Sequence, residues 1–134
     1  MAKTHVQWLE GMNFTGTDGD GRKVQISGSS SGEGVSPMQM LLIALGSCAS
    51  VDVVSILKKQ RQELEDLQVE VEGERGEESP RPYETIHMHF IAQGKVEADK
   101  LERAISLSTE KYCGVHGTLS GVAKITWDYE IKEA

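Results

Sequence analysis

The first 28 residues alternate hydrophobic and polar positions in three short runs. The first run covers residues 4–9 and the second is centred on residues 13–15. The sequence Asp-Gly-Asp-Gly at residues 18–21 is a strong turn signal, and the alternation resumes over residues 24–26. A period of two, broken by turn residues, is typical of half-buried strands. This part of the chain therefore predicts a small antiparallel meander of three strands.

A long hydrophobic helix is predicted over residues 38–57. Ser36 is suited to the N-cap, Pro37 to the first helical position and Gln39 to the third position of a capping box. The positions that follow are hydrophobic on nearly every side, as in a helix that is either buried or membrane-spanning. Polar residues inside the segment, such as Asp52, argue against a lipid environment. The pattern predicts a central helix packed inside the protein, and no membrane partner is expected.

The second half of the chain returns to strands and then to a helix. Alternation predicts strands at residues 67–72 and 86–90, on either side of a polar loop at residues 73–82. From residue 99 the period becomes helical, and the last strand alternates over residues 123–132. The predicted apolar face of that helix, which ends at Cys113, consists of Leu101, Ala104, Ile105, Ser108 and Tyr112.

Strand runs broken by isolated helices indicate an α+β fold. The length of 134 residues fits a single domain covering residues 1–134. The net charge is −7, and no cluster of Lys and Arg is present that would attract nucleic acid. The N-terminus lacks the apolar stretch of a signal peptide, so a cytoplasmic location is expected, where thiols are normally kept reduced.

Candidate chemistry centres on the two cysteines, Cys48 and Cys113. Their residue type alone fits two unrelated buried thiols, since free Cys is among the most buried residues, and it also fits a redox pair. A reactive thiolate needs a nearby cation, and Asp52, one helical turn after Cys48, would oppose it if it pointed the same way. The candidate cations are Arg22, Arg75 and Arg81.

A metal site would have to use Cys113 and His116, together with Cys48 or with His87 and His89. One Cys-x-x-His pair is weak evidence compared with the paired spacing of zinc sites. The two histidines of the 86–90 strand lie on its polar face, where solvent exposure is expected. The residues therefore predict neither a bound metal nor a cofactor.

Small residues at positions 46–50 form a narrow waist in the hydrophobic helix around Cys48. Such a waist lets another backbone or a substrate approach the cysteine closely. It also suits helix packing, for example across a dimer, and the two interpretations are compatible.

The segment Ser36-Pro37-Met38-Gln39-Met40-Leu41-Leu42-Ile43-Ala44-Leu45-Gly46-Ser47-Cys48 resembles the cysteine-helix signature of the OsmC/Ohr family. The stretch from Glu110 to Cys113, followed by a short turn and a final strand, is similar to the family's second cysteine region. The order of elements matches along essentially the whole chain. The run at residues 52–57 is most similar to that of the YhfA-like branch.

This resemblance implies antiparallel sheets around a long, buried, cysteine-bearing helix in an intertwined homodimer. It also implies a thiol-dependent peroxidase that reduces organic hydroperoxides in oxidative stress defence. Cys48 would be the peroxidatic thiolate and Cys113 would resolve its sulfenic acid to a disulfide. A dithiol, such as a lipoylated protein, would then reduce the pair.

One position departs from the family pattern. Members place a glutamate ten residues before the reactive cysteine, where it orients an activating arginine, and this chain has Met38 there. A thioether does not accept a charge-assisted hydrogen bond, whereas the neighbouring Gln39 could orient an arginine such as Arg22. The departure supports an alternative function, in which a catalytically weak or inactive OsmC-like protein binds a small hydrophobic or thiol-reactive ligand at the dimer interface.

Overall fold

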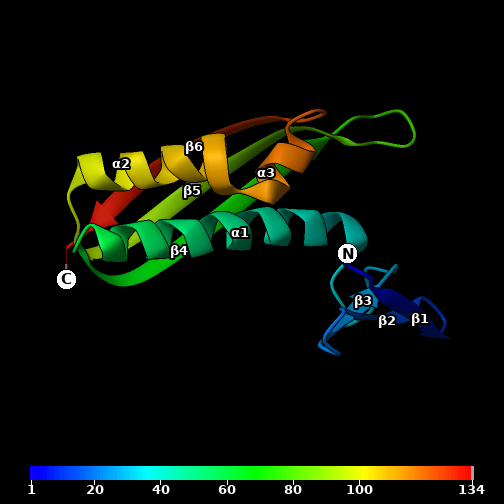
Figure 1. Ribbon diagram of the computed structural model, residues 1–134. Coiled ribbons are helices and arrows are strands. Elements are labelled where there is room, and N and C mark those ends of the chain that lie inside the picture. The colour runs from blue at the N-terminus through cyan, green and yellow to red at the C-terminus, as the bar shows by residue number, and fades with distance from the viewer. Residues whose placement is uncertain (134) are drawn as a thin grey trace. The chain divides into compact units, whose positions relative to one another are not determined.

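The computed structural model describes residues 1–133 and divides into two compact units. The first is built from residues 1–41 and the second begins at residue 42. Figure 1 shows the elements of each unit along the chain. The expectation of a single domain over residues 1–134 stays a prediction, and the two units are described separately.

The first unit contains the predicted meander. Strands β1 (His5–Glu10), β2 (Asn13–Thr17) and β3 (Lys23–Ser27) form an antiparallel sheet in that order. The predicted turn after β2 forms because a side-chain oxygen of Asp18 accepts hydrogen bonds from the backbone N–H groups of Asp20 and Arg22, at 2.8 and 2.9 Å. The meander predicted from the alternation is thus confirmed.

The long helix α1 (Pro37–Lys59) begins where the sequence predicts. The Ser36 hydroxyl accepts a hydrogen bond from the Gln39 N–H at 3.3 Å, as an N-cap should. Within one chain the helix is buried along a single face, whereas the prediction placed it fully inside the protein. The buried face consists of Leu45, Gly46, Ala49, Val53 and Leu57.

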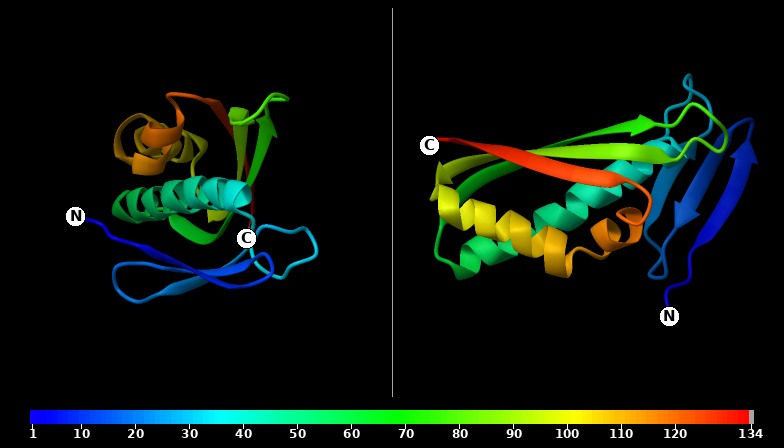
Figure 2. Two further views of the ribbon diagram at one scale, coloured as in Figure 1. Left: turned by 90° about the vertical axis from the view of Figure 1, so that its right-hand side faces the viewer. Right: turned by 90° about the horizontal axis from the view of Figure 1, so that it is seen from above.

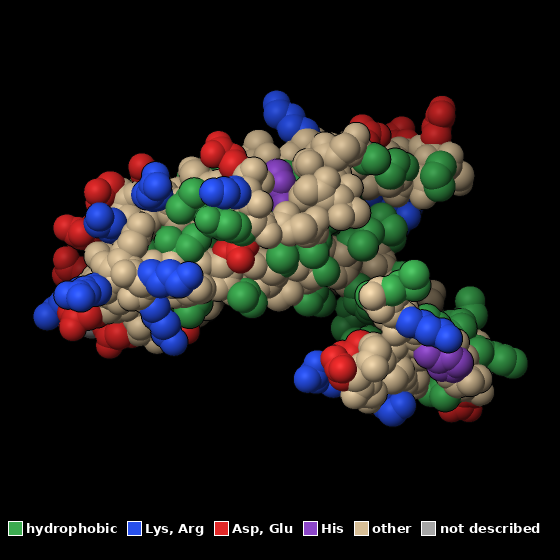
Figure 3. Space-filling model, in the orientation of Figure 1, with side chains coloured by type: hydrophobic (Ala, Val, Ile, Leu, Met, Phe, Trp, Pro, Cys, Tyr) green, Lys and Arg blue, Asp and Glu red, His purple; other side chains and the backbone are tan. Residues whose placement is uncertain are grey.

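Hydrophobic residues also remain exposed on α1. Ile43 and Val51 are 56% and 69% exposed, and Figure 3 shows hydrophobic side chains along this side of the helix. By length and composition α1 could cross a membrane, with 28% of its most hydrophobic window buried. This is weak evidence for a membrane span, because the core helices of soluble proteins can be equally long and hydrophobic.

The second unit is a three-stranded sheet covered on one side by helices (Figures 1 and 2). Strand β4 (Glu63–Arg75) pairs antiparallel with β5 (Tyr83–Lys95), and β6 (Lys124–Lys132) pairs parallel with β5 on its other side. Both strands of the hairpin are longer than predicted. The core face of β5 consists of Ile86, Met88, Phe90 and Ala92, which are at most 1% exposed.

The helix predicted from residue 99 to Cys113 is divided into two parts. Helix α2 (Ala98–Leu107) passes into a π-helical turn, η1 (Ser108–Tyr112), and a short helix α3 (Gly114–Leu119) follows. The π turn widens the helix, which rotates Tyr112 away from the predicted apolar face and leaves it 53% exposed. Its placement on that face was therefore wrong, and α3 was not predicted.

Candidate functional site

The π turn determines where Cys113 lies. The Cys113 N–H donates to the Ser108 carbonyl at 2.7 Å, which closes the wide turn. Cys113 itself is extended, with φ −78° and ψ 103°, and it caps α3 by accepting a hydrogen bond from the His116 N–H to its Sγ at 3.3 Å. π turns often occur at functional sites, and this one positions the Cys113 thiol.

Cys48 lies in the middle of α1, and its thiol lies close to that of Cys113. The two Sγ atoms and a carboxylate oxygen of Asp52 all lie within 4.8 Å of one another. Both thiols are free, Cys113 being only 5% exposed and Cys48 half-buried. The two candidate cysteines, far apart in the sequence, thus come together in one site.

Asp52 is a third member of this site, although the sequence analysis did not include it among the candidate ligands. It follows Cys48 by four residues, which places both side chains on one face of the helix. Its carboxylate accepts a hydrogen bond from the Ser108 hydroxyl at 2.8 Å, and Ser108 is fully buried. This bond joins α1 to η1 and fixes the carboxylate beside the two sulfurs. The i, i+4 spacing of Cys48 and Asp52 was a signal for this pair in the sequence, whereas no sequence signal identified Ser108 as the hydrogen-bond donor.

The two thiols differ in their environments. Burial raises the pKa of the Cys113 thiol to about 11, and hydrogen bonding to Cys48 adds to the effect, while the hydrogen bond from the His116 N–H opposes it. Cys113 is therefore protonated at neutral pH. Burial also lowers the pKa of His116, so its imidazole is favoured in the neutral form.

The small residues around Cys48 allow α1 to approach the sheet. A Cβ atom added at Gly46 would lie 2.9 Å from the Cγ2 atom of Val71 on β4. Cβ atoms in proteins essentially never approach another side chain closer than 3.0 Å, so an alanine here would force a shift. The Ser50 hydroxyl donates to the Gly46 carbonyl at 2.7 Å and so turns its polar atom back onto the helix. The waist thus serves helix–sheet packing within this chain.

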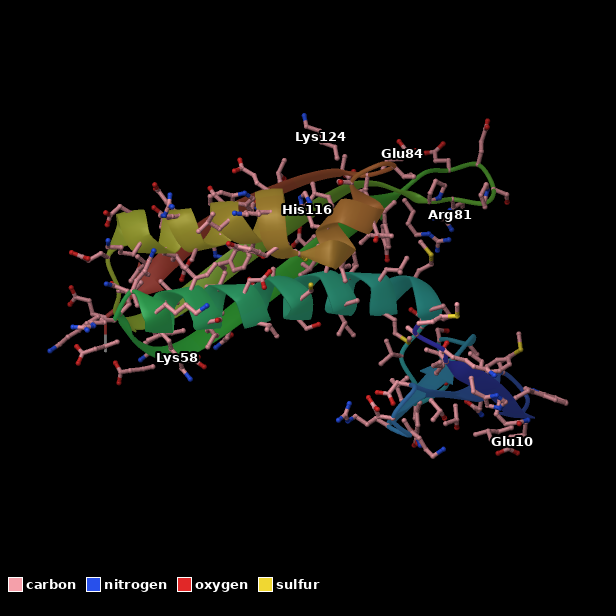
Figure 4. The ribbon with its side chains drawn as sticks, in the orientation of Figure 1. Glu10, Lys58, Arg81, Glu84, His116 and Lys124 are labelled. Atoms are coloured by element: carbon pink, nitrogen blue, oxygen red, sulfur yellow. The ribbon has the colours of Figure 1, made fainter. Side chains whose placement is uncertain are left out.

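The three candidate arginines each have a partner in their own segment. Arg75 Nε donates to the Arg81 carbonyl at 2.8 Å, and Arg81 Nε donates to the Gly76 carbonyl at 3.0 Å. Arg75 is the last residue of β4, and Arg81, which Figure 4 labels, lies in the loop that leads to β5. Arg22 lies 3.4 Å from an Asp20 oxygen, on the surface of the first unit.

The histidines of β5 form a separate polar network. His87 and His89 alternate with the buried residues of the strand and face the uncovered side of the sheet. Asp128 on β6 contacts both, at 3.0 Å from His87 Nε2 and 2.7 Å from His89 Nδ1, and a Glu130 oxygen lies 3.2 Å from His89 Nε2. Hydrogen bonds to Asp128 and Glu130 raise the pKa of His89, and hydrogen bonds to His89 and His87 lower the pKa of Asp128. The network lies on the face of the sheet opposite the helices that carry the cysteines.

Comparisons with known proteins agree with this architecture. The family model described as OsmC-like protein matches residues 29–128. Protein YhfA of Escherichia coli K12 is 41% identical over 133 residues, covering 98% of this chain and 99% of the relative. Two solved structures show the same fold at 16% identity. An OsmC-like protein from Mycoplasma pneumoniae matches with a TM-score of 0.87, covering 98% of this chain and 97% of its own. The organic hydroperoxide resistance protein OhrB of Bacillus subtilis matches with a TM-score of 0.64, covering 97% of this chain and 98% of its own.

Proposed function

The chain belongs to the OsmC-like protein family, and we propose that it is a thiol-dependent peroxidase that reduces organic hydroperoxides. Family membership itself suggests a role in peroxide or oxidative stress. The observation that carries the finer proposal is the meeting of Cys48 and Cys113, whose sulfurs lie within 4.8 Å of each other. The two sulfurs would have to approach further to form a disulfide, whose S–S bond is about 2.05 Å long.

The difference in burial supports distinct roles for the two cysteines. Cys48 is half-buried and accessible to a peroxide, so it is the proposed peroxidatic residue. Cys113 is 5% exposed, with a pKa raised to about 11 by burial and by Cys48, and the protonated thiol is a poor nucleophile. Cys113 is therefore the proposed resolving residue, which reacts only after Cys48 has been oxidised.

The cycle has three steps. The Cys48 thiolate attacks the peroxide oxygen distal to the organic group, forming a sulfenic acid and releasing the alcohol once a proton is taken up. The Cys113 sulfur then displaces hydroxide from the sulfenic acid to form the disulfide, and the Cys113 proton completes a water molecule. The Asp52 carboxylate lies within 4.8 Å of the Cys113 sulfur, beside this proton. A dithiol reductant, such as a lipoylated protein, restores both thiols and leaves as its own disulfide.

The working form in this proposal is a cytoplasmic homodimer. Hydrophobic side chains remain exposed on both units: Trp8 is 61% and Val51 69% exposed in the isolated chain. Covering such side chains is a common reason for self-association. Light scattering coupled to size-exclusion chromatography should give twice the mass of one chain, and a monomer at micromolar concentration would contradict the dimer.

A thiol titration with cumene hydroperoxide tests the peroxidase directly. One equivalent of peroxide should remove both thiols of the reduced protein, and a dithiol should restore them. Cys48→Ser should abolish peroxide consumption. Cys113→Ser should consume one equivalent and then accumulate sulfenic acid, which is trapped by dimedone. Undiminished peroxide consumption by Cys48→Ser, or two surviving thiols in the wild type, would overturn the proposal.

Met38 favours a second function for the same site. Without a carboxylate at this position, the family's means of orienting an activating arginine is absent. The protein would then bind a small hydrophobic or thiol-reactive ligand at the dimer interface without turning over peroxide. A rise in melting temperature with such a ligand, together with no peroxide consumption, would favour this function.

A further inference from the structure

The dithiol site contains three side chains that metal ions bind. Among residues 1–133, Cys48, Asp52 and Cys113 are the one set of three or more Cys, His, Asp or Glu residues whose ligand atoms all lie within 4.8 Å of one another. Ligands of a tetrahedral zinc ion, with Zn–S of about 2.3 Å and Zn–O of about 2.1 Å, stand roughly 3.6–3.8 Å apart. The three atoms would have to close by about 1 Å or less, which small side-chain rotations supply.

Two further hydrogen bonds orient these atoms. The buried Ser108 hydroxyl donates to the Asp52 carboxylate at 2.8 Å, and the His116 N–H donates to the Cys113 sulfur at 3.3 Å. Carboxylate ligands of metals are typically held by such outer hydrogen bonds, which fix their direction. Neither bond has to break when the other lone pairs of the oxygen and sulfur bind an ion.

The donor set also selects the type of ion. Thiolates favour zinc and other thiophilic ions, whereas Mg²⁺ and Ca²⁺ take oxygen ligands. Three protein ligands leave the fourth tetrahedral position for water, which can enter because Cys48 and Asp52 are only half-buried. We propose that the reduced protein binds one zinc ion per chain through Cys48, Asp52 and Cys113, and that this form excludes the disulfide.

The exchange between the two forms is balanced. Zinc binding displaces the protons of both thiols. When zinc leaves, two protons return to the thiols. One equivalent of hydroperoxide then takes two electrons and two protons from them, giving the disulfide, the alcohol and one water. The zinc proposal uses the same cysteines as the proposed peroxidase, but it does not require that activity, because zinc binds before any peroxide is present.

Cobalt(II) provides a direct probe of the site. Reduced, metal-free protein should develop a thiolate-to-cobalt charge-transfer band that saturates at one cobalt per chain and disappears when zinc is added. Cys48→Ser and Cys113→Ser should each lose most of the band. Asp52→Asn, which keeps an oxygen for Ser108, should bind cobalt at least about tenfold more weakly. Asp128→Asn, on the opposite face of the sheet, is the matched control and should bind normally.

Other outcomes overturn the proposal. Absence of the band in the wild type would do so, as would equal cobalt affinity in Asp52→Asn and Asp128→Asn. Circular dichroism and melting temperature establish that each variant is folded. Peroxide consumption is measured separately on metal-free protein, so an inactive protein that binds zinc leaves this proposal standing. A peroxidase that binds no cobalt refutes the zinc proposal alone.

Discussion

The raised pKa of Cys113 predicts a specific loss of stability in alkaline solution. Its thiol titrates at about 11 in the folded protein, against an ordinary value of 9.0, chiefly because it is buried. Below pH 9 the thiol is protonated in both folded and unfolded chains, and its contribution to stability is fully present. Between pH 9 and 11 the unfolded chain releases the proton and the folded chain keeps it, so rising pH favours unfolding.

The magnitude follows from the difference between the two pKa values. Each pKa unit corresponds to about 1.4 kcal/mol, so the free energy of unfolding should fall by about 2 kcal/mol between pH 9 and 11 because of this thiol. Urea unfolding under a reductant, at closely spaced pH values, measures the effect. Since lysines and tyrosines titrate over the same range, the informative quantity is the difference between the wild type and Cys113→Ser.

Serine does not titrate in this range, so the difference should shrink by about 2 kcal/mol on going from pH 9 to 11. Cys48→Ser is the matched control: it retains the buried thiol, and most of the alkaline loss should persist because burial is the larger cause. A difference between the wild type and Cys113→Ser that stays flat across this range would refute the reasoning. It would mean that the Cys113 sulfur is hydrated in the folded protein.

Three further predictions test the packing and the polar contacts. Gly46→Ala should destabilise the protein by up to about 2 kcal/mol in urea unfolding, because the crowding against β4 outweighs the gain in helix propensity. Gly117→Ala is the control: this residue lies in open space on α3, so the substitution should be neutral or stabilising by up to about 1 kcal/mol. Ser108→Ala should cost roughly 1.5–3 kcal/mol in the same assay, because it leaves a carboxylate without its buried donor. Asp128→Asn should lower the pKa of His89 towards its ordinary value of 6.5 in an NMR titration, because the largest cause of its elevation is removed, and an unchanged titration would contradict the network.

The sequence predicted the elements whose pattern arises from local burial. Alternation located the meander and the last strand, and Ser36 and Pro37 located the start of α1 correctly. These signals are local, since each depends on a residue's own conformational preference or on one face of one element. The family resemblance placed both cysteines in one site, which no local pattern could do.

Two features depended on tertiary context and were missed. The π turn at Ser108–Tyr112 inserts extra backbone into a helix whose hydrophobic pattern looks regular, so Tyr112 was placed on the wrong face. The long hydrophobic run of α1 predicted burial on all sides, although one chain covers a single face. A pattern of hydrophobic residues shows which surfaces avoid water, but it does not show whether the same chain or a second copy covers them.

The charge on Asp52 connects the two proposals for the dithiol site. The Asp52 carboxylate places an oxygen within 4.8 Å of both sulfurs. A divalent cation at this point balances the charges of the site, because two thiolates and one carboxylate then surround a double positive charge. Zinc should therefore protect the thiols only while it occupies Cys48, and its removal by a chelator should restore peroxide consumption in full. Asp52→Asn removes a charge that binds the ion, so zinc should inhibit peroxide consumption less strongly in this variant, while the disulfide still forms.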